Sequence, residues 1–178
     1  MANEKHEKRQ HDNYHGLRYA RHKIAELIPH GVIFVEPFGG HAWVSREVCR
    51  KKAKKCVIGD IDPEPLEWAK KYHKLDNAIF KVQDWKKTVA QTDSPNTVFL
   101  FDPLWNIHSC TPKDPRPGAC GKNFYPEIIE TAKRLKGRSI IAFPITMRKQ
   151  ICPKVKECKT IKVKQGKLTF KYGIAIVK

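Results

Sequence analysis

Four acidic side chains in this sequence come at or just after the ends of short apolar runs. The acids are Glu36, Asp60, Asp84 and Asp102, and the runs are residues 32–35, 56–60, 78–82 and 97–101. If the runs are parallel strands, their carboxyl ends meet at one edge of a sheet, which is where such sheets bind ligands. A cleft lined with carboxylates disfavours phosphates. It can accept hydrogen bonds from ribose hydroxyls, from an ammonium group or from an exocyclic amine.

Those three groups occur together in S-adenosylmethionine, which joins an adenine, a ribose and an amino acid through a sulfonium centre. The acidic edge therefore indicates this cofactor rather than a phosphorylated dinucleotide, in spite of the glycines at 39 and 40. Glu36 and Asp60 also have a structural interpretation, because acids at strand-to-helix turns often cap the helix that follows.

The net charge of the chain favours a polyanionic partner. The 178 residues include 35 Lys and Arg against 18 Asp and Glu, a formal net charge of +17. Such a surface favours nucleic acid, with an affinity that falls as salt rises. The alternative is a lysine-rich solvated surface of the kind found in heat-adapted proteins. No apolar run is long enough to span a membrane, and the first residues lack the apolar core of a secretion signal, so we expect a cytoplasmic protein.

The cysteines fall into three pairs that are close in sequence. They are Cys49 and Cys56, Cys110 and Cys120, and Cys152 and Cys158. None has C-x-x-C spacing, so we expect no structural zinc site and no metal. Reduced, partly buried thiols and disulfides of the kind found inside thermophiles both fit this pattern, and the sequence leaves the two open.

The remaining pattern alternates strands with helices. Helices are expected at residues 17–28, 63–73 and 126–135, with another that ends at Arg50, and a fifth strand is expected at 139–143. Residues 160–164 and 168–172 alternate around a Gly-containing turn, which predicts a hairpin. Continuous apolar strands separated by helices are typical of a parallel sheet covered on both faces. We therefore predict an α/β, Rossmann-like domain over 16–178, closed by an antiparallel β pair, after a flexible basic tail over 1–15.

The segment Glu36-Pro-Phe-Gly-Gly40 resembles the E-P-F-x-G-G turn of the DNA adenine methylase family, which modifies the 6-amino group of adenine. Four more segments resemble motifs of that family, in the same order. They are Tyr19-Ala-Arg-His-Lys23 (W-A-G-G-K), Asp60-Ile-Asp62 (D-I-N), Gln83-Asp84-Trp85 (x-D-F) and Asp102-Pro-Leu-Trp105 (D-P-P-Y). The resemblance covers residues 17–105, and the general plan of class I methyltransferases accounts for the rest.

The resemblance implies how S-adenosylmethionine would be bound. Lys23 would reach its carboxylate, Asp60 its ribose hydroxyls and Asp84 its adenine amine. The full set of cofactor residues implied in this way is Tyr19, Lys23, Glu36, Pro37, Phe38, Gly39, Gly40, Asp60, Ile61, Asp84 and Trp85.

The resemblance also implies how the target amine would be held. Asp102 and the carbonyl of Pro103 would accept hydrogen bonds from it, and Trp105 would stack on the flipped base. Leu104 stands where the family has a second proline, which would loosen this catalytic turn. His41 stands where a small residue is expected, and we expect its side chain to be solvated.

Two features bear on the substrate. The family's base-reading domain lies between its third and fourth motifs, whereas residues 84–98 form only a short connection here. The loop over residues 106–125 follows the catalytic turn and carries Lys113, Arg116 and Lys122, which we expect to contact phosphates beside the target base.

Three functional hypotheses follow. The first is methylation of an adenine amine in DNA. The second is methylation of an RNA base by the same fold, because folded RNA presents unstacked bases directly. The third is a nucleic-acid-binding protein that has lost catalysis, which Leu104 and the glycines missing after Tyr19 would favour. The oligomeric state stays open.

Overall fold

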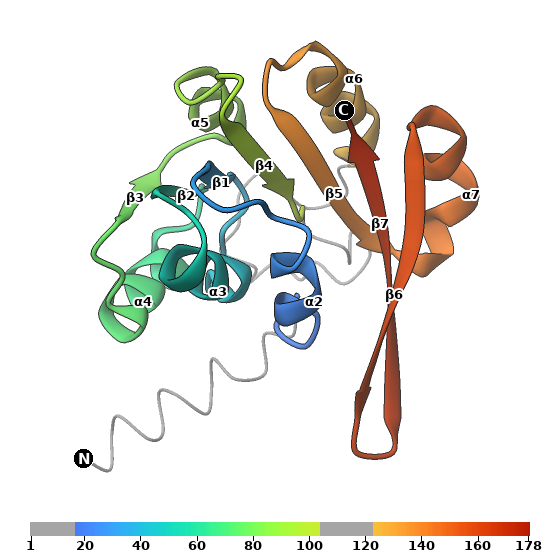
Figure 1. Cartoon of the computed structure of the whole chain (residues 1–178), viewed down its shortest axis with the longest axis horizontal. Coiled ribbons are helices and arrows are strands. Elements are labelled where there is room, and N and C mark those ends of the chain that lie inside the picture. Colours follow the sequence, from blue (N-terminus) through green and yellow to red (C-terminus); the bar gives the residue numbers. More distant parts are fainter. Residues whose placement is uncertain (1–16, 104–122) are drawn as a thin grey trace, which may run out of the picture.

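The chain folds around a seven-stranded sheet with the strand order β3-β2-β1-β4-β5-β7-β6 (Figure 1). The computed structural model describes residues 17–103 and 123–178. The strands are β1 (Ile33–Glu36), β2 (Lys55–Asp60), β3 (Ala78–Val82), β4 (Thr97–Phe101), β5 (Arg138–Pro144), β6 (Glu157–Gln165) and β7 (Leu168–Val177). β1 to β5 are parallel, and β7 runs antiparallel to both β5 and β6. The predicted fold class is confirmed.

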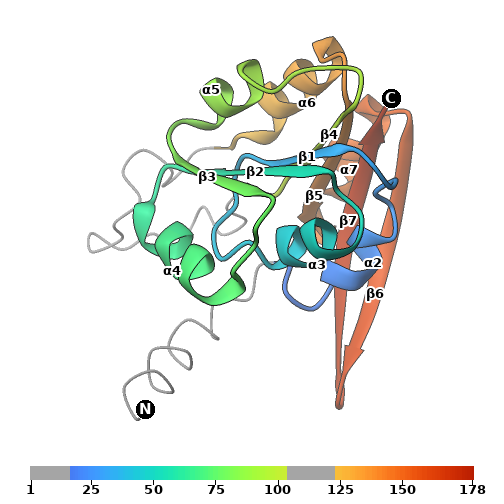
Figure 2. The ribbon, with the colours of Figure 1, turned by 60° about the vertical axis from the view of Figure 1, so that its left-hand side comes forward.

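Helices cover both faces of the sheet (Figure 2). α2 (Arg21–Ala25), α3 (Trp43–Lys51) and α4 (Pro63–His73) lie on one face. α5 (Trp85–Ala90), α6 (Tyr125–Arg134) and α7 (Arg148–Ile151) lie on the other. Because β1 has neighbours on both sides that follow it in sequence, the strand order reverses between β1 and β4, and this is the place where such sheets bind ligands.

The central strands β1 and β4 are almost entirely apolar because each contributes side chains to two cores. Successive side chains of a strand point to opposite faces. Phe34 of β1 and Leu100 of β4 belong to the core under α2, α3 and α4. Val35 and Phe99, their neighbours in sequence, belong to the core under α5 and α6. A sheet buried on both faces cannot show the polar–apolar alternation of a half-exposed one.

The structure shortens one predicted helix. The apolar spacing over residues 17–28 correctly marks Leu17, Ile24 and Ile28 as buried, but α2 spans only Arg21–Ala25. On either side the backbone closes tighter turns, in which Ala20 N–H donates to Leu17 O and Ile28 N–H to Ala25 O. The short helices between β5 and β6, including α7, were not predicted. They are single turns, too short to show a periodicity.

Two of the three cysteine pairs are disulfides. Cys49 of α3 is bonded to Cys56 of β2, with Cα atoms 6.0 Å apart. Cys152 is bonded to Cys158 of β6, with Cα atoms 5.4 Å apart. The structure therefore favours the disulfide interpretation at these two pairs. Loops of this size restrict the unfolded chain enough to stabilise the fold by about 2 kcal/mol each.

Several predicted features lie outside the described residues. They are the tail over 1–15, the pair Cys110 and Cys120, and the residues Leu104, Trp105, Lys113, Arg116 and Lys122. Among the residues that are described, no helix has the length and apolar character needed to cross a membrane.

Candidate active site

The turn between β1 and α3 depends on two glycines for different reasons. A Cβ on Gly39 would come within 2.4 Å of Ile58 Cγ2 and 3.1 Å of the Gly59 carbonyl oxygen, so no side chain fits there. Gly39 N–H donates to that same carbonyl over 2.6 Å, which holds the turn against the end of β2. Gly40 has a φ of +48° and nothing within 4 Å of a Cβ position, so its backbone borders open space.

Asp60 joins that turn to the end of β2. Its Oδ2 accepts a hydrogen bond from Gly40 N–H over 2.8 Å, and its Oδ1 accepts one from Asp62 N–H over 3.1 Å. Burial raises the pKa of this carboxyl, while the backbone N–H groups of Asp62, Gly40 and Ile61 act to lower it. Asp62, not Asp60, caps α4, by accepting from Glu64 N–H. A carboxylate has about four acceptor sites, so Asp60 can still accept from a ligand beside these backbone donors.

Glu36 is 3% exposed at the end of β1. Its Oε2 accepts hydrogen bonds from both the backbone N–H and the hydroxyl of Ser45, in the first turn of α3. Burial raises the pKa of the Glu36 carboxyl to about 7, the Ser45 donors act against that rise, and the charge of Asp60 adds to it. Glu36 therefore makes the helix-capping contacts of its structural interpretation.

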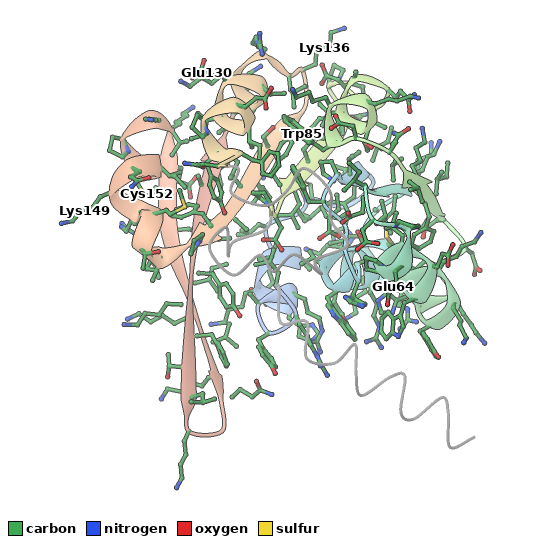
Figure 3. The ribbon with its side chains drawn as sticks, turned by 180° about the vertical axis from the view of Figure 1, so that it is seen from behind. Glu64, Trp85, Glu130, Lys136, Lys149 and Cys152 are labelled. Atoms are coloured by element: carbon green, nitrogen blue, oxygen red, sulfur yellow. A yellow bond between two sulfur atoms is a disulfide. The ribbon has the colours of Figure 1, made fainter. Side chains whose placement is uncertain are left out.

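The third acid also caps a helix. Asp84 is exposed and accepts from Lys86 N–H at the start of α5. Its neighbour Trp85 is 5% exposed and points into the core (Figure 3), where its ring centroid lies 5.6 Å from that of Phe38 and 6.0 Å from that of Phe101. This packing leaves Trp85 little surface for an adenine ring. Trp85 instead packs against Phe38, in the turn after β1.

Two apolar side chains remain exposed at the same edge of the sheet. Ile61, directly after β2, is 49% exposed, and Val82, the last residue of β3, is 57% exposed. Asp60 and Val82 are partners across β2 and β3, so the two apolar side chains border the acid. Exposed aliphatic groups beside a carboxylate suit a ligand that has a planar ring as well as hydroxyls.

The charge of Asp102 acts on two tyrosines that the sequence analysis did not identify as site residues. Burial, with a smaller contribution from the Asp102 charge, raises the pKa of Tyr172 in β7 to about 12 and raises that of Tyr125 in α6 further. The Tyr125 hydroxyl donates to the Ala142 carbonyl over 3.3 Å. Tyr172 lies beside Asp102 because β7 runs antiparallel to β5 and brings Tyr172 opposite Pro144, the last residue of β5. No local sequence pattern specifies that register, so the sequence analysis could not identify Tyr172.

The first family segment lies against the C-terminal hairpin. The Tyr19 ring stacks on Phe170 of β7 with centroids 4.9 Å apart, and the ammonium group of Lys23 donates to the Lys162 carbonyl of β6 over 2.7 Å. Tyr19 is also among the groups whose charge raises the pKa of Tyr172, so it lies near that residue. The structure thus places both Tyr19 and Lys23 against the C-terminal hairpin, and Lys23 is bound to β6 rather than to the turn after β1.

The prediction for His41 is wrong. The residue is 5% exposed, not solvated, and its ring lies edge-on to Trp68 of α4 with centroids 4.9 Å apart. His73, also on α4, has its Nε2 2.8 Å from the His41 carbonyl oxygen, and burial lowers the pKa of His73 to about 4. Trp68 of α4 packs against the His41 imidazole, and no spacing rule within the turn itself could have shown that.

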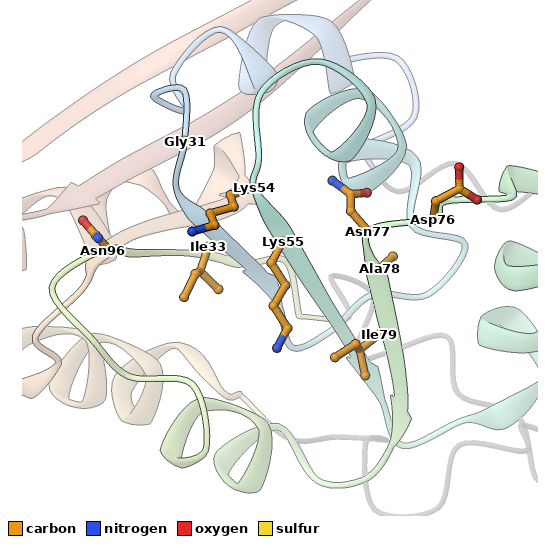
Figure 4. Close-up of a pocket in the computed structure, with 9 residues that line it drawn as sticks. All are labelled: Gly31, Ile33, Lys54, Lys55, Asp76, Asn77, Ala78, Ile79 and Asn96. Carbon is orange, nitrogen blue, oxygen red and sulfur yellow. The ribbon is translucent and has the colours of Figure 1, made fainter.

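A pocket of about 470 Å³ lies at the opposite, amino-terminal edge of the sheet (Figure 4). Lys54, Lys55 and Asn77 are among its lining residues, and none of the four acids lines it. Asn77 has a structural role, since its amide donates to the carbonyls of Cys49 and Ala53. In the two described segments, no group of three or more His, Cys, Asp or Glu could hold a metal ion.

Comparisons with known proteins agree on the fold. No family model matches the sequence, and no curated protein is similar to it. Precorrin 8W decarboxylase of Methanobacterium thermoautotrophicum superposes with a TM-score of 0.63 at 12% identity, over 89% of each chain. An rRNA methylase of Streptococcus thermophilus gives a TM-score of 0.52 at 12% identity, over 89% of this chain and 93% of that one.

A third similar structure was solved with a ligand. It is a Streptococcus mutans protein assigned as a methyltransferase, in complex with SAH, with a TM-score of 0.55 at 12% identity over 91% of this chain and 98% of that one. Identities this low show a shared fold and nothing finer. The chain therefore has the Rossmann-like fold of class I methyltransferases, with seven strands and an antiparallel C-terminal pair.

Proposed function

We propose that this chain is an S-adenosylmethionine-dependent methyltransferase that modifies an exocyclic amine of a nucleic-acid base, with the adenine 6-amino group as first candidate. The observation that carries the proposal is that the candidate cofactor residues and the candidate target residue lie at one edge of the sheet. The turn at Gly39 and Gly40, Asp60 and Ile61 lie at the carboxyl ends of β1 and β2, and Asp102 follows the adjacent β4.

The residues present fit the cofactor. Gly40 offers exposed backbone with no atom where a side chain would stand, and the Asp60 carboxylate lies 2.8 Å from its N–H. Asp60 would accept from the ribose hydroxyls and Ile61 would pack on the adenine, while Asp84 at the end of β3 would accept from the adenine amine. When bound, S-adenosylmethionine supplies an electrophilic methyl group. Trp85 and Lys23 have other partners here and are left out of this set.

The chain's own contribution is to orient the target amine. Asp102 and the Pro103 carbonyl would accept its two N–H groups, which directs the nitrogen lone pair away from them and toward the methyl donor. The gain comes from holding the reacting atoms in line, not from a general base. Tyr125 in the core on one face of the sheet and Tyr172 in the core on the other both lie near enough to Asp102 for its charge to act on them. Leu104 and Trp105 would complete this turn, as the resemblance implies.

RNA is the substrate that the architecture favours over duplex DNA. Between β3 and β4 the described chain has only α5 and its flanking turns, so the base-reading domain of the DNA adenine methylases has no counterpart there. Unstacked bases in folded RNA need no such domain. The similarity in fold to an rRNA methylase is compatible with this choice. Methyl transfer from labelled S-adenosylmethionine to total RNA and to genomic DNA, measured side by side, tests it.

We expect Asp60→Ala to weaken S-adenosylmethionine binding by roughly 10–100-fold, because hydrogen bonds to a charged acceptor are lost. Isothermal calorimetry measures the Kd directly. Asp93→Ala is a matched control: Asp93 Oδ1 also accepts two backbone N–H groups, from Lys136 and Gly137, but at the amino-terminal edge of the sheet.

The control separates cofactor binding from general damage to the fold. Both variants should lose some stability in thermal unfolding, and only Asp60→Ala should change the Kd. Equal effects of the two on the Kd would remove Asp60 from the cofactor site. A wild-type chain that binds nucleic acid but shows no heat with S-adenosylmethionine would instead support a binding protein without catalysis.

A further inference from the structure

The β6–β7 hairpin extends beyond the carboxyl edge of the sheet. β5 ends at Pro144, which pairs with Tyr172, and past that point β6 and β7 continue for four more residue pairs, from Lys162 opposite Lys171 to Gln165 opposite Leu168. At the usual rise of a strand these pairs add about 14 Å. Figure 1 shows the hairpin running past the rest of the sheet. We call residues 162–171 the arm.

One face of the arm is held against the body of the protein. Val163 and Phe170 pair across the two strands and pack on the core under α2. Tyr19 stacks on Phe170, and the Lys23 ammonium group binds the Lys162 carbonyl. These contacts to α2 and to the turn before it hold the base of the arm in place.

The other face of the arm is a row of lysines. Lys162, Lys164 and Lys171 are exposed there, and Lys167 lies in the turn. Lys162 and Lys171 stand directly opposite each other in the register, an arrangement of like charges that destabilises a sheet. In the part of the chain that the structure describes, no carboxylate forms an ion pair with any of these four lysines. Residues 148–171 hold nine Lys and Arg and one Glu.

The row continues toward the body of the protein at the carboxyl edge of the sheet, the edge on which the candidate active site lies. Arg148 donates to the Thr160 hydroxyl over 2.7 Å, which places its guanidinium at the base of the same face. Tyr172, the residue after Lys171 and therefore on the opposite face of β7, lies near Asp102. At the tip, Leu168 is 64% exposed, the largest fraction among the exposed large apolar side chains of the described residues.

We propose that the arm is the docking surface for the RNA substrate, with Lys162, Lys164 and Lys171 contacting phosphates beside the base that enters the active site. The identity of the partner rests on the proposed function. A row of uncompensated lysines costs stability and suits a polyanion that crosses the row. Such contacts position the strand without reading its sequence. The exposed Leu168, on the opposite face of β7 from Lys171 but at the tip, offers an apolar side chain to bases at the end of the arm.

The test compares two triple variants with the same loss of charge. In Lys162→Gln/Lys164→Gln/Lys171→Gln the arm is neutralised. In Lys54→Gln/Lys55→Gln/Lys136→Gln three exposed lysines at the amino-terminal edge are changed, and Lys136 lies at the opposite end of the molecule from the hairpin (Figure 3). The probe is total RNA without cofactor, titrated by filter binding at several salt concentrations.

We expect the arm variant to bind RNA about tenfold more weakly at low salt, and its plot of log K against log salt to be shallower by about 2, since each phosphate contact to a single strand contributes roughly 0.7. The control triple should keep the wild-type slope. A Lys→Arg triple at the arm should restore both affinity and slope. Circular dichroism melting checks that the variants fold.

Two results would overturn the proposal. Equal losses in the two Gln triples would show that only total charge matters, and a wild-type chain with no affinity for RNA would exclude this partner. The proposed activity fails separately, because a chain that binds RNA through the arm but transfers no methyl group would refute the enzyme and leave the docking surface standing.

Discussion

Replacing Asp102 with alanine is expected to reduce methyl transfer by roughly 10²–10³-fold, the usual cost of removing one preorganised polar contact from a reacting group. Asp102 directly follows β4, and its charge acts on Tyr125 and Tyr172. Binding of S-adenosylmethionine should change by less than twofold, because Asp60 and not Asp102 borders the cofactor turn.

Initial rates with saturating RNA and labelled S-adenosylmethionine measure the first effect, and calorimetry measures the second. Asp76→Ala is the control, an exposed aspartate at the amino-terminal edge whose loss should leave the rate unchanged. If Asp102→Ala and Asp60→Ala lost equal cofactor affinity, the assignment of one acid to the target and the other to the cofactor would be wrong.

The second large effect concerns stability as a function of pH. Burial raises the pKa of Glu36 from its ordinary 4.5 to about 7. The native state therefore holds a proton that the unfolded chain releases between these values. The Glu36 contribution to stability is fully present below about pH 4.5 and is lost as pH rises to 7, by about 3 kcal/mol in total.

Glu36→Gln removes this titration, so the variant should gain stability relative to wild type as pH rises from 5 to 8. His73 acts in the opposite sense, because its lowered pKa makes stability rise with pH between about 4 and 6.5. Taking the difference between variant and wild type cancels the His73 contribution. Urea unfolding at pH 5 and pH 8 gives the two free energies, with the exposed Glu67→Gln as control. A difference that stays constant with pH would show that Glu36 is already ionised at pH 5.

The sequence predicts most strands of the sheet well, because the patterns that mark them are local. The strands over 78–82 and 97–101 and the helix over 63–73 match the structure residue for residue, since each is a short run bounded by turn residues or by Pro63. The antiparallel closing pair follows from alternation around Gly166, which has a φ of +56°. The length of α2 could not be predicted, because the same buried spacing fits a helix and a series of tight turns.

The sequence indicates where the candidate site lies but not which partners its acids bind. The acids at strand ends indicate the correct edge, because a parallel sheet places those ends together whatever the loops do. What each acid binds depends on neighbours from other elements. Ser45 donates a hydrogen bond to Glu36, and Gly40 N–H donates one to an oxygen of Asp60. Tyr172 and the arm enter only through the pairing of β7 with β5, a register that no local pattern specifies.

A crystal structure with S-adenosylhomocysteine is the most direct test of the central claim. We predict density at the carboxyl edge of the sheet, with the ribose on Asp60, the adenine on Ile61 and backbone of Gly40 in contact with the ligand. Density in the amino-terminal pocket beside Lys54 and Asn77 would contradict this account, and so would a fully occupied ligand that makes no contact with Asp60.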